Sequence, residues 1–225
     1  IILNNKHIAF IPARKGSIGL KYKNRLFFGN TANFLDKIDI FDEILVSSDD
    51  SEVITCAKER NYLTQYRKSE LSGSSISIKS VLENVIAEMN VDPETYIWLF
   101  YLPILYKNES DFINTMSKIT KYKIKSLCSF IPAMSHPLNC WMYSNDIGLE
   151  QYIENDVFRR QDLPKAWTHH HYLCAFKAGC IDDLNSELIN ASTFPVFLDR
   201  GVADNLVEVD TPEDYKEWKR IIGDK

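Results

Sequence analysis

The segment IPARKGSIGLKYKN, residues 11–24, decides how the chain begins to fold. It continues the apolar run Ile8–Phe10, and a short apolar run that a proline ends is typical of a buried strand, which we expect over His7–Ile11. Two glycines and four cations then share one short loop. Such a loop lets the backbone approach a phosphate, whose charge the cations neutralise. The glycine spacing matches neither a Walker loop nor a dinucleotide fingerprint, so the loop indicates either another kind of phosphate site or a solvated basic turn.

Beyond this loop, short apolar runs alternate with amphipathic helical patterns. We expect further strands at 41–47, 96–105, 126–131 and 170–176, and helices at 51–60, 77–89, 111–119 and from 210 to about 222. This alternation predicts a three-layer α/β fold, with a mostly parallel twisted sheet and helices on both faces. Ligands of such sheets bind outside the carboxyl ends of the strands. We expect one domain over 1–225, with the polar, irregular segment 135–163 as an extending lobe.

Composition narrows the class of protein. The 225 residues are 45% hydrophobic and 25% charged, with a net charge of −5, which argues against a general nucleic-acid surface. No apolar run approaches the roughly 20 residues of a membrane span, and no signal-peptide pattern is visible. The five cysteines are odd in number and form no CxxC pair, so reduced thiols fit better than disulfides or a zinc site. We therefore expect a cytoplasmic protein without nucleic-acid or membrane partners.

Six segments carry a family resemblance. In chain order they read IPARKGSIGLKYKN, FDEILVSSDDSEVITCAKE, YRKSELSGSSISIKSVL, SHPLN, RRQDLP and VEVDTPEDY. Together they cover most of the chain and resemble the motifs of the CMP-sialic acid synthetase (acylneuraminate cytidylyltransferase) family. The resemblance implies a nucleotide-diphospho-sugar transferase-like fold with a small lobe for dimerisation and for covering the sugar.

The same resemblance implies an activity. Members of that family join CTP to the anomeric hydroxyl of a sialic-acid-like nonulosonic acid and release pyrophosphate, with Mg²⁺ as cofactor. For this chain it implies a cytidylyltransferase whose partners are CTP and a sugar acid, and whose assembly is a homodimer. Catalysis would rest on positioning and on neutralising the charge that develops on the phosphates.

Residue roles are carried over by position. The catalytic set implied by the resemblance is Arg14, Lys23 and Asp210. The nucleotide-binding set is Ala13, Arg14, Gly16, Ser17, Lys21, Lys23, Asn24, Arg67 and Ser77. The sugar-binding set is Tyr101, Lys107, Arg160, Gln161, His170 and His171. The metal ligands are Asp210 and Glu208, whose hard oxygens suit Mg²⁺.

The chain departs from the family pattern at several positions. Ile18 replaces a loop lysine, the stretch 101–107 replaces a polar turn, Glu208 stands where an aspartate is usual, and the stretch 24–41 reads short. The acceptor therefore stays open, and an eight-carbon (Kdo-type) sugar acid or a non-catalytic binding relative are alternatives. A glycosyltransferase is a weaker alternative, since the stretch 48–50 is a poor match to an Asp-x-Asp motif.

Several candidate residues also have structural interpretations. Asp210 could cap the last helix, and Asp49 and Asp50 could end a strand and cap the helix that follows. In the triplet 169–171, neighbouring side chains on a strand point to opposite faces, and no third metal ligand is evident. Metal binding, sugar contact and strand packing all remain open there. Cys174 reads as a small buried residue rather than a nucleophile.

Overall fold

The computed structural model describes residues 5–16 and 19–223. The main sheet contains β1 (His7–Pro12), β2 (Glu43–Ser48), β3 (Leu63–Tyr66), β4 (Tyr96–Leu99), β5 (Ser126–Pro132), β8 (Trp167–Lys177) and β9 (Phe194–Phe197). The helices are α1 (Lys23–Leu35), α2 (Ser51–Glu59), α3 (Ile78–Glu88), α4 (Glu109–Tyr122), α5 (Arg200–Ala203) and α6 (Pro212–Gly223). Short 3-10 turns are η1 (Ser69–Leu71), η2 (Pro137–Asn139), η3 (Arg160–Asp162) and η4 (Ala178–Asp183). Ser17 and Ile18, which the sequence analysis discusses, lie outside the described residues.

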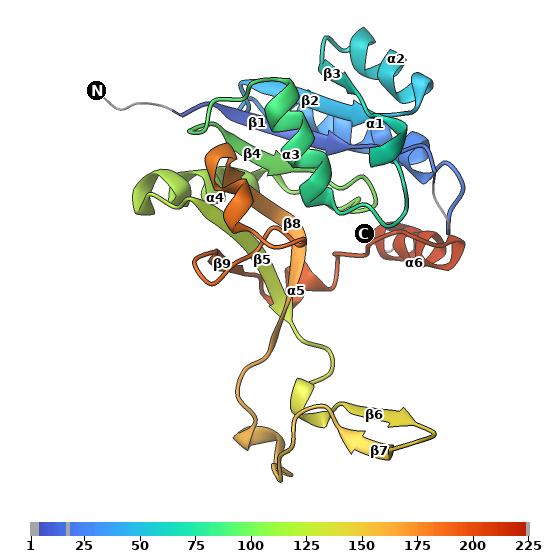
Figure 1. The fold of residues 1–225 in the computed structure, drawn as a ribbon, viewed down its shortest axis with the longest axis vertical. Helices are drawn as coiled ribbons and strands as arrows, with labels where there is room; N and C mark the ends of the chain where they lie inside the picture. The colour runs from blue at the N-terminus through green and yellow to red at the C-terminus, as the bar shows by residue number, and fades with distance from the viewer. Residues whose placement is uncertain (1–4, 17–18, 224–225) are drawn as a thin grey trace.

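The sheet is mostly parallel, as the alternation of strands and helices predicts. Its strand order is β3-β2-β1-β4-β8-β5-β9, and β8 runs antiparallel to both of its neighbours while the other pairings are parallel (Figure 1). The β1–β2 and β1–β4 pairings bring the carboxyl ends of three strands to one edge of the sheet. The residues that follow β1, β2 and β4 therefore meet there.

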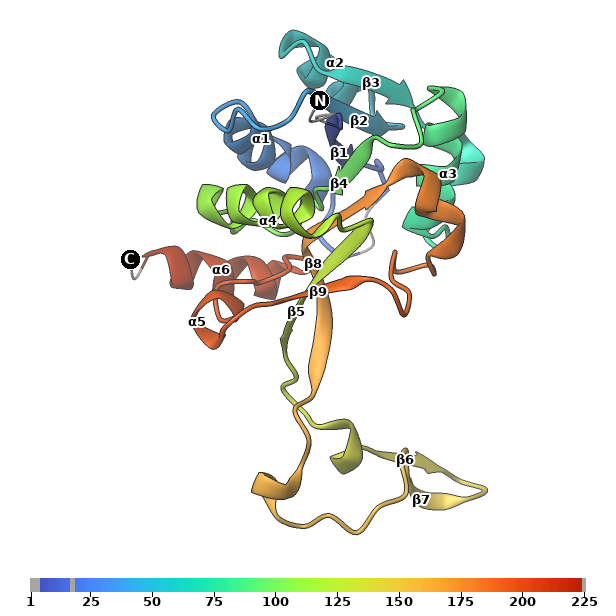
Figure 2. The ribbon, with the colours of Figure 1, turned by 90° about the vertical axis from the view of Figure 1, so that its left-hand side faces the viewer.

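Helices cover both faces of the sheet. In β1, Ala9 and Ile11 enter a core shared with α1 and α4, whereas Ile8 and Phe10 enter a second core shared with α3. Figure 2 shows α1, α4 and α6 on one side of the strands and α3 on the other. The expected three-layer α/β fold is confirmed.

The stretch that reads short in the sequence forms a complete helix. α1 occupies Lys23–Leu35, a stretch for which the sequence analysis names no element. Its inward positions follow a helical period and are Asn24, Phe27, Phe28, Thr31, Ala32 and Leu35. That period was present in the sequence, so α1 was predictable.

A lobe of residues 133–166 extends beyond the ends of β5 and β8 (Figures 1 and 2). It carries a two-stranded pair, β6 (Trp141–Ser144) and β7 (Gly148–Gln151). Large apolar side chains on the lobe are exposed, among them Met134 and Phe158 at 94% and 90%. Within the described residues, no helix has the length and apolar character needed to span a membrane.

Candidate active site

The loop after β1 is anchored at both ends. Ala13 N donates to the Ser47 carbonyl at 2.9 Å, and the Ser48 hydroxyl donates to the Ala13 carbonyl, so the loop starts against the end of β2. Asn24 at the start of α1 donates its side-chain amide to the Arg14 carbonyl at 2.8 Å. These contacts hold the backbone around Arg14 and leave its guanidinium free to point elsewhere.

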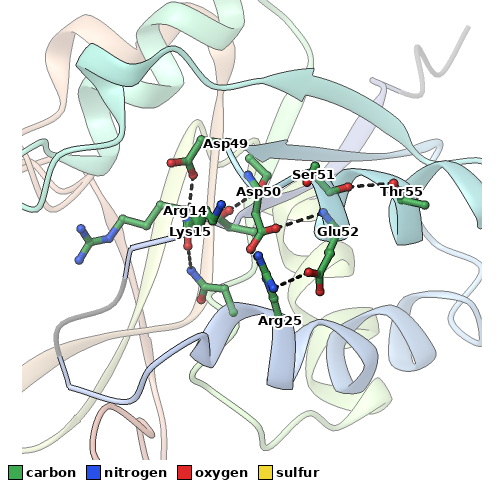
Figure 3. A network of polar contacts seen from close by, with 11 residues as sticks. Arg14, Lys15, Arg25, Asp49, Asp50, Ser51, Glu52 and Thr55 are labelled. Carbon is green, nitrogen blue, oxygen red and sulfur yellow. Dashed lines mark hydrogen bonds and ion pairs between the residues drawn. The ribbon is translucent and has the colours of Figure 1, made fainter.

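Two aspartates after β2 brace the same loop (Figure 3). Lys15 N donates to the Asp49 carboxylate at 2.7 Å. Asp50 accepts from Glu52 N at 3.1 Å, which caps α2, and also pairs with Arg25. The interpretation of Asp50 as a helix cap is confirmed. Figure 3 shows the Arg14 side chain extending away from these contacts.

A cavity of about 180 Å³ lies where the strand ends meet. It gathers cations and acids from distant parts of the chain against an apolar wall. Its lining residues are Pro12, Arg14, Lys23, Asn24, Arg67, Ile76, Ile78, Val81, Tyr101, Pro103, Glu208 and Asp210. The proposed catalytic residues and both proposed metal ligands thus share one cavity.

Arg67 is a buried cation of this cavity, with 4% of its surface exposed. Its guanidinium donates to the hydroxyl and the carbonyl of Ser47 at 3.2 and 3.1 Å. Burial lowers the pKa of Arg67 to about 10, with the Asp49 carboxylate opposing the shift and Arg14 adding to it. Arg67 therefore stays charged at neutral pH. Neither Arg14 nor Arg67 forms an ion pair with another described residue, so both favour an anionic ligand.

Glu208 and Asp210 form the acidic side of the cavity. Val209 N donates to the Pro103 carbonyl at 3.0 Å, which ties this segment to the chain after β4. Burial raises the pKa of Glu208, and the nearby Asp210 carboxylate raises it further, while Lys23 lowers it. Asp210 itself pairs with Lys23. Two carboxylates that repel each other in one cavity fit a hard divalent cation such as Mg²⁺.

Asp210 does not cap the last helix. Thr211 N and Asp210 N both donate to the Asp214 carboxylate, at 2.8 and 3.1 Å. Asp214 N in turn donates to the Thr211 hydroxyl at 3.2 Å. This reciprocal arrangement of Thr211 and Asp214 serves the start of α6. The Asp210 carboxylate therefore remains available to pair with Lys23 and to line the cavity.

Some predicted nucleotide contacts lie outside the cavity lining. Lys21 is exposed, with its ammonium 5.0 Å from the centre of the Tyr22 ring, and Gly16 is exposed as well. Ser77 caps α3, with its hydroxyl accepting from Ser80 N at 3.1 Å. Its neighbours Ile76 and Ile78 line the cavity, so Ser77 lies beside it.

Of the predicted sugar contacts, Tyr101 lines the cavity and His171 adjoins it. The two rings meet edge to face with 5.4 Å between centroids. His170 lies on the same strand, and its Nδ1 accepts from Tyr172 N at 3.2 Å. Burial, with help from the two flanking histidines, lowers the pKa of His170 to about 4.

The other sugar candidates are not brought to the cavity. Lys107 points toward α1, donating to the Ile104 carbonyl at 2.6 Å and contacting Asn30 at 3.3 Å. Burial lowers its pKa to about 7. Arg160 and Gln161 lie in η3 on the lobe, where Arg160 lines a separate cavity of about 670 Å³. Within one chain the sugar set is therefore divided between the sheet edge and the lobe.

The sequence analysis did not predict the apolar side of the nucleotide cavity. Ile76, Ile78, Val81 and Pro103 line one side of the cavity. The helical period of α3 directs Val81 inward, so part of this wall could have been found from the pattern. Ile76 and Pro103 sit in loops and carry no such signal.

Solved structures define the class of fold. A CMP:2-keto-3-deoxy-manno-octonic acid synthetase in complex with CTP matches at a TM-score of 0.66 and 14% identity, over 98% of this chain and 99% of that one. A 4-diphosphocytidyl-2C-methyl-D-erythritol synthase matches at 0.62 and 12%, over 98% and 100%. The chain thus has the fold of these cytidylyltransferases.

Among curated proteins, the chain is similar to N-acylneuraminate cytidylyltransferases of Streptococcus agalactiae serotypes III, Ia and V. Each is 26% identical over 167 residues, which is 70% of this chain and 40% of the relative. The resemblance that the six sequence segments carry is confirmed by these matches. The chain spans about 40% of the length of these relatives. No protein-family model matches the chain.

Proposed function

We propose that this chain is a Mg²⁺-dependent cytidylyltransferase that joins CTP to the anomeric hydroxyl of a sialic-acid-like nonulosonic acid. The observation that carries the proposal is the cavity in which Arg14, Lys23 and Arg67 face Glu208 and Asp210. The similarity to curated N-acylneuraminate cytidylyltransferases supports the choice of nucleotide and of sugar class.

The proposed reaction requires a site that binds the phosphates; it does not require a nucleophilic residue that forms a covalent intermediate. The anomeric hydroxyl of the sugar acid releases its proton to solvent as its oxygen attacks the α-phosphorus of CTP. The bond from that phosphorus to the bridging oxygen breaks, and pyrophosphate leaves. Negative charge grows on the leaving oxygens, where cations stabilise it. Among the described residues, no carboxylate forms an ion pair with Arg14 or Arg67, so the positive charge of both guanidinium groups can act on the phosphates. Lys23 would exchange Asp210 for a phosphate oxygen.

Size constrains how CTP would lie. About 180 Å³ is less than the roughly 300–1,000 Å³ of pockets that enclose a whole ligand. The cavity would therefore hold only part of the nucleotide, and the remainder would lie along its open mouth.

Glu208 and Asp210 are the residues that would hold Mg²⁺. Both offer hard oxygen ligands, and a cation between them would remove the repulsion that raises the pKa of Glu208. When bound, Mg²⁺ supplies charge neutralisation at the triphosphate.

The positions of the proposed sugar-contacting residues support a homodimer. Tyr101 and His171 adjoin the cavity, but Arg160 and Gln161 lie on the lobe with its exposed apolar side chains. A second copy that covers the lobe would bury this surface and could bring the Arg160 guanidinium to a sugar carboxylate. The five cysteines are free thiols, which suits the proposed cytoplasmic location.

The test is pyrophosphate release from CTP with Mg²⁺ over nine- and eight-carbon ulosonic acids, with ATP, GTP and UTP as nucleotide controls. The proposal expects release with CTP and a nine-carbon acid only. Release with an eight-carbon acid alone would move the acceptor to the Kdo type. CTP binding without release from any acid would favour the non-catalytic relative.

A further inference from the structure

A bulge in β8 brings together three side chains that a regular strand would separate. Cys174 pairs with Cys128 of β5, yet the next pair along is Ser129 with His170, so residues 171–173 bulge out of register. The Ser129 hydroxyl donates to the His170 carbonyl and accepts from Leu173 N at 3.0 Å. It thereby satisfies backbone groups that the bulge removes from the ladder.

Two buried thiols lie beside the bulge. Cys128 and Cys174 are 0% and 1% exposed, and the Cys128 thiol lies 3.6 and 3.7 Å from the carbonyl oxygens of Ser129 and His170. One ring nitrogen of His171 and the two sulfur atoms all lie within 4.8 Å of one another. Ligand atoms around tetrahedral zinc lie roughly 3.5–3.8 Å apart, so shifts on the order of 1 Å would close this set on a metal.

A backbone contact fixes the tautomer of His171. Its Nε2 lies 2.9 Å from the Glu187 carbonyl oxygen. A carbonyl only accepts, so Nε2 carries the proton and Nδ1 keeps its lone pair. Metal-binding histidines typically donate their other ring N–H to a carbonyl or carboxylate in this way.

The carbonyl that orients His171 is itself fixed. Asn185 Oδ1 accepts from Glu187 N at 2.9 Å and from Ile189 N at 3.0 Å, which closes a tight turn. Leu188 sits in that turn with a φ of 59° and 1% of its surface exposed. The buried Leu188 side chain anchors the turn in the core, and the turn fixes the position of the Glu187 carbonyl.

We propose that Cys128, Cys174 and His171 bind a thiophilic divalent cation, for which Zn²⁺ is the natural choice. Two thiolates and a neutral imidazole match the ligand preference of Zn²⁺. Binding releases two thiol protons and leaves a site of zero net charge, which a buried position tolerates. The fourth position falls to water.

A second set of ligands lies on the outer side of His171. Glu187 Oε2 lies 3.5 Å from His169 Nε2 and 3.8 Å from His171 Nε2. That set needs the lone pair of His171 on Nε2, the atom that donates to the Glu187 carbonyl. Its members His169 and Glu187 are also more exposed than the thiols. The hydrogen bonding therefore favours the set formed by Cys128, Cys174 and His171 over the set formed by His169, His171 and Glu187.

The metal site contains no residue of the proposed nucleotide site, although His171 is also a predicted sugar contact. Its link to that site is Tyr101, whose ring contacts His171 and also lines the cavity. A bound metal would fix His171 and so the wall of the cavity next to it. The spacing of the ligands, at positions 128, 171 and 174, hides the site from any CxxC search.

The test uses the whole chain, unfolded in reductant and refolded with Co²⁺ or with Zn²⁺. We expect one bound metal per chain and, with Co²⁺, a near-ultraviolet thiolate-to-metal charge-transfer band. Because this readout needs no variant, a folding defect caused by a substitution cannot obscure it. Refolded protein with no bound metal, or with bound Co²⁺ but no such band, would overturn the proposal.

Variants then locate the metal. Cys174→Ala should abolish the charge-transfer band, whereas Cys56→Ala, at an exposed thiol, should leave it unchanged. Glu187→Gln keeps the backbone carbonyl and should also leave the band unchanged. If the metal is lost in Glu187→Gln but still binds in Cys174→Ala, it is held by His169, His171 and Glu187, and the proposal is contradicted.

Discussion

Lys23 and Asp210 stand 187 positions apart in the chain and form an ion pair in the candidate nucleotide cavity. Lys23 is the first residue of α1, directly after the first loop, and Asp210 lies two residues before the first residue of α6. A backbone hydrogen bond joins the same two segments, because Leu20 N donates to the Asp210 carbonyl at 2.8 Å. Both partners have roles in the proposed reaction, so a triphosphate with Mg²⁺ would replace their mutual contact.

Asp210→Asn should raise the Mg²⁺ concentration for half-maximal pyrophosphate release at least about tenfold, because an amide replaces a charged ligand. Stability should fall by no more than about 1 kcal/mol, since the Asp210 side chain is 52% exposed and solvent screens the pair. Mg²⁺ titrations and urea unfolding measure the two effects. Asp204→Asn, at an exposed carboxylate directly after α5, is the control. An unchanged Mg²⁺ requirement would remove Asp210 from the metal site.

Arg14→Ala should reduce turnover by roughly 100-fold or more, as loss of a preorganised charge partner does. Its free energy of unfolding should change by less than about 0.5 kcal/mol, because the guanidinium forms no ion pair with a described residue. Steady-state release of pyrophosphate from CTP checks the first statement and thermal unfolding the second. Lys118→Ala removes an exposed cation of α4 and should leave both values as they are. Full activity in the Arg14 variant would exclude the loop from the mechanism.

Gly19 and Gly29 offer a matched pair of substitutions. A Cβ at Gly19 would lie 2.3 Å from the Asp210 carbonyl oxygen, whereas a Cβ at Gly29 meets nothing within 4 Å. Gly19→Ala should therefore displace the loop and abolish CTP binding. Gly29→Ala lies inside α1 and should stabilise the chain by about 0.5–1 kcal/mol. Calorimetric CTP titration and thermal unfolding distinguish them, and tight CTP binding by the Gly19 variant would contradict the loop geometry.

Glu208→Gln should stabilise the chain near neutral pH while it lowers activity. The pKa of folded Glu208 lies above its ordinary 4.5, so the folded state loses stability as pH rises through that pKa and the carboxylate ionises. The glutamine variant lacks this loss. A gain of about 1 kcal/mol would raise Tm by roughly 2–4 °C at pH 7.5. Below pH 4.5 the two proteins should unfold together, and a gain that persisted there would have another origin.

His170 should make the fold sensitive to acid. Its pKa falls from 6.5 to about 4 on folding, so the unfolded chain binds a proton more readily. The stability contribution is complete above pH 6.5 and is lost as pH falls toward 4. His170→Asn keeps an acceptor for Tyr172 N and should flatten urea midpoints between pH 7 and pH 5. Equal slopes in the two proteins would assign the acid sensitivity to other groups.

Local patterns predicted most of the sheet and its covering helices. The apolar run before Pro12 became β1, and the capping signals at Asp50 and Ser77 became the starts of α2 and α3. Such signals act over a few residues, which is why they can be seen in the sequence. The four-residue strands β3 and β9 were not predicted, because each has one buried residue, whereas all four residues of β4 are buried and form an apolar run.

By itself, the sequence determined the α/β class, the basic loop behind β1 and the order of the motifs that resemble cytidylyltransferases. Only the tertiary structure decided that Lys23, Arg67 and Asp210 share a cavity, that Arg160 lies apart on the lobe, and that the bulge in β8 turns His171 toward two thiols. The physical reason is distance along the chain. Helical periods and caps arise between near neighbours, whereas these contacts form only after long loops have closed around a packed sheet.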